Sequence, residues 1–318
     1  MLPPMPPHHP VLDPAAAYPK ITQLRSVLGA RDWPAVRKLL DTAEPVERDC
    51  LIQDRDENAG LEEFLRGVLR EDPDDSTAGA LLGQHLIHAA WEIRTDARAN
   101  NVSQQQFADF HRVLREAEIA LIDAAARTPE DPAIWTARLT TARGLQLGQS
   151  EARRRYDRLA EVAPHHLPAQ RQLLQQFCPK WSGTWEKVHT FAREAAGAVA
   201  PGALNAVLIA EVHMEHWGDF DNHAERAAYL RSEEVRSEVY EAARRSVWHP
   251  DFRRTHGWVS VMSTFAAVFA LFDDMPAVAS LFTALGDLAT EWPWSYIGDA
   301  PTVISQYRAR ALPGGGAA

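Results

Sequence analysis

A short sequence motif that contains a proline recurs along this chain, and it constrains the fold more than any other feature. In each copy a helix-forming segment runs into a proline, a short polar turn follows, and an alanine opens the next apolar segment. Copies begin at Pro73, Pro129, Pro164 and Pro201, and the last three lie 35 and 37 residues apart. Periods in the thirties are typical of stacked helical hairpins, in which each hairpin buries its apolar face against its neighbours. The sequence therefore predicts an all-α protein, an α-α superhelix or solenoid of antiparallel helical hairpins.

Helical patterns fill the chain, whereas sustained period-two alternation is almost absent. Ala152, Tyr156, Leu159 and Ala163 recur at three- and four-residue steps, which places them in one apolar stripe of a helix. Pro164 ends this helix because proline disfavours helical geometry at the preceding residue. The same patterns predict four short helices, at 20–28, 33–42, 45–54 and 60–70, and five pairs, 76–94 with 105–128, 131–146 with 150–163, 166–177 with 184–199, 203–217 with 233–248, and 252–272 with 276–290.

Composition divides the chain into four regions. Residues 1–18 are proline-rich and residues 299–318 end in a glycine-rich run, so the first region is predicted to be disordered and the last largely so. Between them, residues 19–72 are predicted to hold the short helices and residues 73–298 the helical repeats.

Charge and cysteine content exclude several classes of protein. The net charge of −10 argues against nucleic-acid binding, which needs a basic surface. Cys50 and Cys178 lack metal-binding spacing, and a chain with two distant cysteines fits a reducing compartment. No signal-peptide pattern opens the sequence, and no apolar run has the length of a membrane span. We expect a cytoplasmic protein with neither nucleic-acid nor membrane partners.

One repeat carries recognisable family residues. Trp135 stands in a first helix, Ala152 and Tyr156 stand in the second, and Pro164 closes the pair. This pattern resembles the tetratricopeptide-repeat superfamily, over about residues 73–292, although the family's first-helix glycine and tyrosine are replaced. The second and fifth units, counting the N-terminal short helices as the first, also carry extra residues between their helices. The resemblance implies a right-handed superhelix whose concave face, lined mainly by first helices, binds peptides or other proteins.

A repeated histidine pair is the sharpest local signal. His85 and His88 lie seven and ten residues after the alanine that opens their helix, and His213 and His216 lie at the same two positions of theirs. Glu92 shares the rim of the apolar stripe with the first pair. Histidines three residues apart project to one side and could ligate a metal ion. Each pair offers only two donors and no HExxH or CxxC motif adds more, so we predict no metal and no cofactor. Hydrogen bonding to the inserts and contact with a ligand or partner both stay open.

Two tryptophans mark a turn between helices. Trp181 and Trp185 lie four residues apart, on either side of Gly183, where the chain passes from one helix to the next. They could anchor the hairpin or form a binding platform. We include both tryptophans with the histidines and Glu92 as candidate binding residues.

Two functions remain consistent with these observations. The first is a non-catalytic scaffold that binds a protein or peptide on its concave face. The second is an enzyme or small-ligand-binding protein whose site combines histidine, glutamate and tryptophan side chains of the first helices. The sequence holds no recognisable catalytic residues, which favours the scaffold. An open apolar groove would support the first function, and a pocket with converging His, Glu and Trp side chains would support the second.

Overall fold

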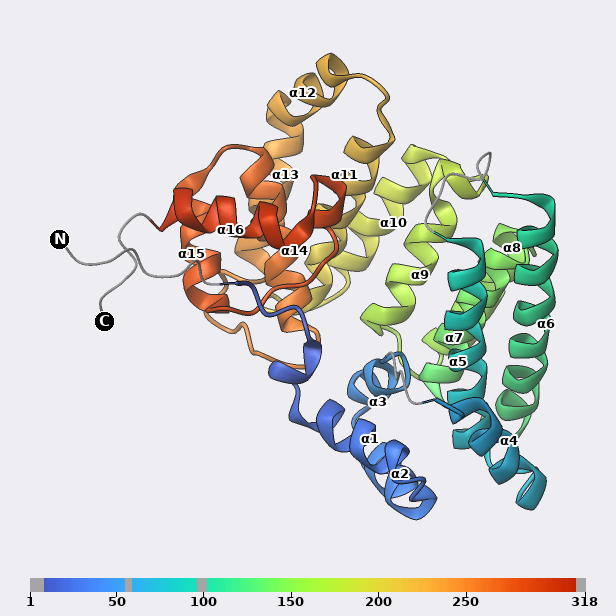
Figure 1. Ribbon diagram of the computed structural model, residues 1–318. Helices are drawn as coiled ribbons and strands as arrows, with labels where there is room; N and C mark the ends of the chain where they lie inside the picture. Colours follow the sequence, from blue (N-terminus) through green and yellow to red (C-terminus); the bar gives the residue numbers. More distant parts are fainter. Residues whose placement is uncertain (1–8, 55–58, 96–101, 313–318) are drawn as a thin grey trace. The chain divides into compact units, whose positions relative to one another are not determined.

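The structure, a computed structural model, describes residues 9–54, 59–95 and 102–312 (Figure 1). In these residues sixteen α-helices, α1 to α16, are joined by turns and four short 3-10 helices, and no strand is present. An isolated parallel bridge pairs Val11 with Leu288. The all-α prediction is confirmed for this part of the chain, whereas the superhelical arrangement stays a prediction. None of these helices combines the length and the apolar character needed to cross a membrane.

The chain forms two compact units. Unit 2 is Pro19–Thr184, and unit 1 combines Met1–Tyr18 with Trp185–Ala318, so unit 2 is an insertion along the sequence of unit 1. The predicted boundary between residues 72 and 73 falls inside unit 2. The helices on its two sides, α4 and α5, pack against each other there, with the apolar face of α4 buried.

Unit 2 contains the first nine helices, close to their predicted ranges. Four short helices come first and two long ones follow. Their bounds are α1 Pro19–Gly29, α2 Trp33–Asp41, α3 Pro45–Ile52, α4 Leu61–Glu71, α5 Ser76–Arg94, α6 Gln104–Arg127, α7 Pro132–Gly144, α8 Gln149–Ala160 and α9 Leu167–Phe177, with a 3-10 helix η3 at Pro179–Trp181.

In the structure, two copies of the recurring motif form the N-terminus of a helix. Asp75 is the N-cap of α5 and accepts a hydrogen bond from the backbone N–H of Ala78, at 3.0 Å. Asp131 caps α7 in the same way and accepts from Ala133, also at 3.0 Å. An N-cap carboxylate satisfies one of the N–H groups that a helix start leaves without an intrahelical acceptor. In these two copies the polar turn supplies the cap, and the alanine supplies the N–H group that it binds.

The hairpin of α5 and α6 depends on two glycines of α5. A Cβ atom on Gly83 would lie 2.5 Å from Leu121 Cγ, and one on Gly79 would lie 3.0 Å from Ala124 Cβ. The missing side chains allow the two long helices to approach closely. The close packing of α5 against α6 is part of the core of unit 2.

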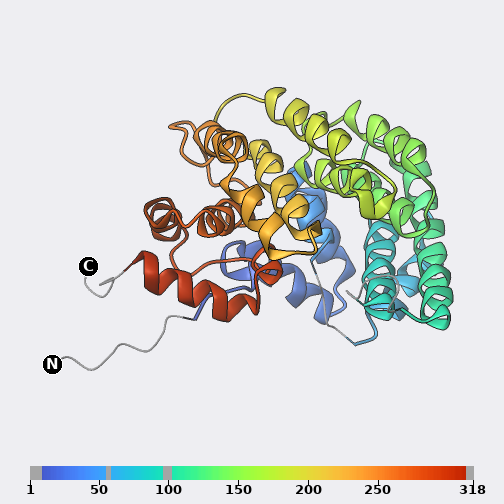
Figure 2. The ribbon, with the colours of Figure 1, turned by 90° about the horizontal axis from the view of Figure 1, so that it is seen from above.

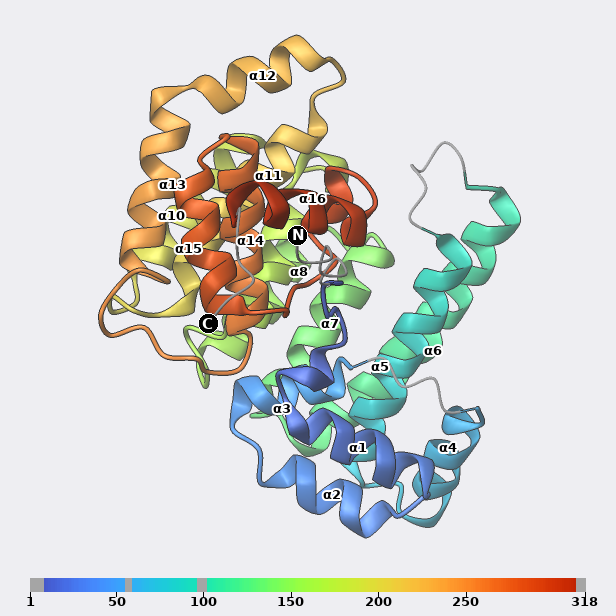
Figure 3. The same cartoon turned by 60° about the vertical axis from the view of Figure 1, so that its left-hand side comes forward.

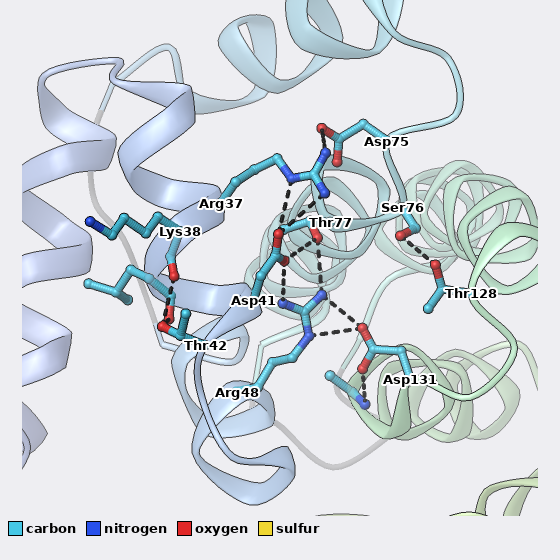
Figure 4. Close-up of polar contacts among 12 residues, drawn as sticks. Arg37, Lys38, Asp41, Thr42, Arg48, Asp75, Ser76, Thr77, Thr128 and Asp131 are labelled. Carbon is cyan, nitrogen blue, oxygen red and sulfur yellow. Dashed lines mark hydrogen bonds and ion pairs between the residues drawn. The ribbon is translucent and has the colours of Figure 1, made fainter.

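Helix α3 covers the first helices of three successive pairs. It packs against α5, α7 and α9. Arg48 of α3 donates to Asp131 through Nε and Nη2, at 2.9 and 2.8 Å, and to Thr77 Oγ1 at 3.1 Å (Figure 4). The next residue, Asp49, is fully buried, and its Oδ2 lies 2.5 Å from Nε2 of the buried His166. The chain's own α3 therefore occupies the first-helix face of unit 2.

Unit 1 contains the remaining seven helices. Its described core includes α11 and α14, which are buried along most of their lengths. The bounds are α10 Trp185–Gly197, α11 Val207–Asp219, α12 His223–Arg231, α13 Glu233–Arg245, α14 Trp258–Leu271, α15 Met275–Leu285 and α16 Ala300–Ala311, with 3-10 helices η1 at Pro14–Ala16, η4 at Leu204–Ala206 and η5 at Trp294–Tyr296.

Two helices of unit 1 were not predicted. Helix α12, His223–Arg231, forms within the extra residues of the fifth unit and packs against both α11 and α13 (Figure 3). Helix α16 forms where a largely disordered tail is predicted, and Figures 1 and 2 show it as a continuous red helix. The prediction is wrong for residues 300–311, because Asp299 caps the helix and Val303 and Ile304 bury an apolar face. Residues 313–318 lie outside the described residues.

The N-terminal segment is also ordered where it is described. Val11 exchanges backbone hydrogen bonds with Asp287 and Ala289, at 2.8 and 3.0 Å. Tyr18 stacks on His256 with ring centroids 4.0 Å apart, and its hydroxyl accepts from the backbone of Gly257 at 3.1 Å. The prediction of disorder is wrong for residues 9–18, because these contacts bind the segment to unit 1. Residues 1–8 lie outside the described residues.

Candidate functional site

Five side chains of unit 1 converge from four helices and form what we call the histidine cluster. His189 comes from α10, His213 and His216 from α11, Tyr229 from α12 and Glu238 from α13. Two of the five, His213 and His216, are predicted site residues. Since the helices pack against one another, the cluster stands on regular backbone, which holds side chains more precisely than loops do.

Local sequence explains how these helices present the five side chains. His213 and His216 are three residues apart on α11, so they share one side of that helix. Asn222 caps α12 by accepting from the N–H of Glu225 at 2.8 Å, and Arg226 donates to the carbonyl of Phe220 at 2.9 Å. These two contacts shape the turn after α11 and bring α12 back across it.

Short hydrogen-bond distances connect the members of the cluster. His213 Nδ1 lies 2.6 Å from Tyr229 Oη, and His213 Nε2 lies 2.9 Å from Glu238 Oε2. His216 Nδ1 lies 3.1 Å from His189 Nε2 and 3.2 Å from Tyr229 Oη. His213 is only 5% exposed. The cluster is therefore a continuous polar network within a largely apolar packing of helices.

Burial keeps two imidazoles neutral. It lowers the pKa of His189 to about 4, and the neighbouring His213 and His216 act in the same direction. Burial together with His213 lowers the pKa of His216 to about 4 as well. Burial raises the pKa of Tyr229, and the nearby carboxylate of Glu238 adds to this effect. At neutral pH both rings therefore offer a lone pair, and the phenol keeps its proton.

Glu238 is the negative charge of the cluster. The hydrogen bond from His213 lowers its pKa to about 2, and Arg193 adds to this shift. Arg193 donates through Nε to Glu238 Oε1 at 2.6 Å, and its second contact, to Oε2, is longer at 3.3 Å. The carboxylate is thus ionised at neutral pH, with Oε2 turned toward the histidines.

Aromatic rings fix the orientation of His216. Trp185 stacks on it with ring centroids 4.2 Å apart and an interplanar angle of 8°. Phe220 also stacks on His216, at 5.3 Å and 13°. A flat contact with two large rings restricts rotation of the imidazole. Trp185 is therefore a predicted site residue that does reach the cluster.

Trp181 and Glu92 do not join this site. Trp181 belongs to unit 2, where its ring meets Trp91 edge-on with centroids 6.1 Å apart. The guanidinium groups of Arg94 and Arg143 lie 5.9 and 5.8 Å from the Trp181 ring centre. Glu92 is exposed on α5. Trp181 and Trp185, four residues apart in the sequence, thus belong to different units.

The first histidine pair lines a small pocket in unit 2. His85 and His88 form its polar side with Gln84, whose Nε2 lies 2.8 Å from His88 Nε2. Arg25 and Asp54 form a two-bond ion pair at the same pocket, at 2.7 and 2.9 Å. The remaining lining residues are leucines and an isoleucine: Leu24, Leu28, Leu51, Ile52, Leu61 and Leu81.

The donor count behind the prediction of no metal is wrong for the second pair. Ligand atoms of His189, His213 and Glu238 all lie within 4.8 Å of one another. His189, Glu238 and Tyr229 are not among the site residues predicted from the sequence. His189 follows Trp185 by four residues on a predicted helix, which places it on the same helix face and was a usable signal. Glu238 is one of several glutamates on α13, and nothing in the sequence distinguishes it.

No protein-family model matches this chain, and comparison with curated proteins finds no relative. The function proposed for it therefore rests on its own residues.

Proposed function

We propose that the protein binds a small ligand at the histidine cluster of unit 1, the second of the two functions considered from the sequence. One observation carries this proposal: two imidazoles held neutral by burial bring His189 Nε2 and His216 Nδ1 to 3.1 Å, beside the carboxylate of Glu238. A pair of ring nitrogens at this distance can share one hydrogen bond or direct two lone pairs at a common guest.

The surroundings of the cluster support a ligand site. Trp185 and Phe220 supply flat apolar walls on His216, and His213, Tyr229 and Glu238 supply polar atoms from separate helices. A few fixed polar groups within apolar walls are the usual composition of a small-molecule site.

The arrangement of α3 in unit 2 weighs against the scaffold function, because that function needs accessible first helices. The resemblance implies that first helices line the surface that receives a partner. In unit 2, α3 packs on α5, α7 and α9, and Arg48 and Asp49 bind it there through buried polar contacts. A peptide would have to displace α3 before it reached these helices.

Native mass spectrometry of the purified full-length protein tests the proposal. The expected result is a bound species on the wild type that disappears in His189→Ala. His223→Ala is the matched control, because His223 is an exposed histidine on α12. A wild type that carries no bound species, and that is not stabilised by any member of a library of metal salts and metabolites, would contradict the proposal.

Partner binding remains a second proposal, on a different surface. Ile119 and Ile122, three residues apart on α6, are 61% and 45% exposed. Large contiguous apolar patches mark contact surfaces, and these two side chains, one helical turn apart, would form the centre of such a patch. Replacing both by serine should abolish capture of any partner protein and leave the ligand of unit 1 in place.

A further inference from the structure

We infer that the ligand of the histidine cluster is a divalent transition metal ion of the zinc class, held by His189, His213 and Glu238. This inference rests on the proposed function, since it names the ligand of that same site. Each donor comes from a different helix of unit 1: α10, α11 and α13.

The donor atoms already lie near coordinating distance. Zinc binds histidine nitrogen and carboxylate oxygen at about 2.0–2.2 Å, so neighbouring donors of a tetrahedral site lie about 3.4 Å apart. His213 Nε2 and Glu238 Oε2 are 2.9 Å apart, and the whole group lies within 4.8 Å. Donors at the 4.8 Å limit would have to approach by about 1.4 Å, and the pair at 2.9 Å would have to separate by about 0.5 Å, to reach the spacing of about 3.4 Å around one ion.

Two further side chains provide the supporting shell that metal sites need. A ligating histidine usually donates its second ring N–H to an oxygen, which fixes the ring and its tautomer. If His213 binds the ion through Nε2, its proton resides on Nδ1, where Tyr229 Oη lies 2.6 Å away as acceptor. Arg193 binds Glu238 Oε1 at 2.6 Å and Oε2 only at 3.3 Å, whereas His213 Nε2 lies 2.9 Å from Oε2.

The donor set selects a class of ion. Two imidazoles and one carboxylate suit zinc, cobalt and related divalent ions, whereas magnesium and calcium prefer oxygen ligands throughout. The protein should therefore discriminate strongly between Zn²⁺ and Mg²⁺.

The alternative to a metal site is a purely structural hydrogen-bond network with the same members. Such a network needs no ion, because His213 already contacts Tyr229 and Glu238 on its two sides. It predicts that added zinc changes neither the melting temperature nor any spectrum. A site that binds metal in the native state alone instead raises the melting temperature with ion concentration.

The test uses full-length protein stripped with a chelator and titrated with Zn²⁺ by calorimetry and with Co²⁺ by visible absorption. We expect one ion per chain, ligand-field bands of four-coordinate cobalt, and no response to Mg²⁺. His189→Ala and Glu238→Gln should each abolish stoichiometric binding. Tyr229→Phe, which removes only the supporting acceptor, should weaken binding by about 10–100-fold. His223→Ala should bind as the wild type does.

The outcomes separate the two proposals. If the wild type binds no zinc but retains an organic ligand that His189→Ala loses, the metal inference fails and the proposed function stands. If the wild type binds neither, both fail. Zinc binding that persists unchanged in His189→Ala and Glu238→Gln also overturns the inference. Circular dichroism of the stripped variants shows that they fold; if one does not, the other decides the question.

Discussion

Two histidine pairs share the same three-residue spacing and have different surroundings. His85 and His88 on α5 face a small, mainly apolar pocket, and His88 contacts Gln84 of its own helix. His213 and His216 on α11 meet side chains of three other helices, among them His189 and Glu238. In each pair the three-residue spacing places both histidines on one side of their helix. The neighbouring helices decide whether such a pair becomes a cluster of donors.

The inserts and flanking helices account for this difference. After α11 the chain forms α12, which returns across α11 and brings Tyr229 to the histidines. In unit 2 the N-terminal helices fill the corresponding role of covering the first helices, and they bring leucines and an Arg–Asp pair to the pocket. Two repeats can thus share a backbone pattern, while the helices packed against them determine which side chains surround the histidines.

The largest expected effect concerns α3, which covers the first helices α5, α7 and α9 within unit 2. Asp49→Ala should lower the free energy of unfolding by about 3–5 kcal/mol, because it removes two hydrogen bonds of a buried carboxylate, to His166 and to Gln53, each of which contributes about 1.5–3 kcal/mol. Glu44→Ala, at the exposed N-cap position of the same helix, is the control. Urea unfolding of both variants measures the difference. Equal midpoints would show that α3 is not anchored by this contact and would reopen the first-helix face to a partner.

A second prediction compares the two histidine pairs directly. His213→Ala should cost about 1–3 kcal/mol of stability, because Tyr229 Oη and Glu238 Oε2 each lose a buried partner. His85→Ala, at a half-buried position, should cost about 0.5 kcal/mol. Thermal and urea unfolding in the presence of a chelator provide the measurement. A larger loss for His85→Ala would reverse the contrast drawn between the two pairs.

The ranges of most helices could be predicted from the sequence, because the residues that start, end and pack a helix lie within or next to it. N-cap aspartates such as Asp75 and Asp131, helix-ending prolines and apolar stripes act within one helix, and the predicted ranges in unit 2 agree closely with the structure. Helix α16 escaped prediction because the glycine-rich end dominated the composition of its region, while its own buried side chains, Val303 and Ile304, are few.

The candidate site was only partly predictable, for a related reason. His213 and His216 could be selected from their spacing on one helix, and Trp185 from its position at a turn, four residues after Trp181. Glu238 and Tyr229 reach the cluster through the packing of α12 and α13, which depends on contacts between helices. Pairing within one helix can be inferred from periodicity, whereas convergence between helices requires the fold.

The third prediction is a pH dependence that belongs to unit 1. The pKa values of His189 and His216 lie near 4 in the folded protein, against an ordinary value of 6.5. Between these two values the unfolded chain binds protons that the folded chain does not, so stability should fall as pH decreases from 6.5 toward 4. His216→Phe, which preserves stacking between Trp185 and Phe220, should flatten this slope in chelator-treated protein.

Melting temperatures recorded at several pH values between 7.5 and 4 test this prediction. His223→Ala should retain the full slope of the wild type, because this exposed residue is outside the cluster. A slope that is unchanged in His216→Phe would mean that the acid sensitivity arises elsewhere in the chain.

The smallest expected effect isolates the contribution of α12. Tyr229→Phe removes one hydroxyl, which lies 2.6 Å from His213 Nδ1 and 3.2 Å from His216 Nδ1, and leaves the aromatic packing in place. Loss of these hydrogen bonds should cost about 0.5–1.5 kcal/mol of stability. Nitrogen-15 spectra of the histidine side chains should show a shifted Nδ1 resonance for His213, because Nδ1 loses its hydrogen bond to Tyr229 while Nε2–H continues to donate to Glu238. If the stability and the Nδ1 resonance of His213 are both unchanged, the hydroxyl of α12 makes no contribution, and the difference between the two histidine pairs lies in His189 and Glu238 alone.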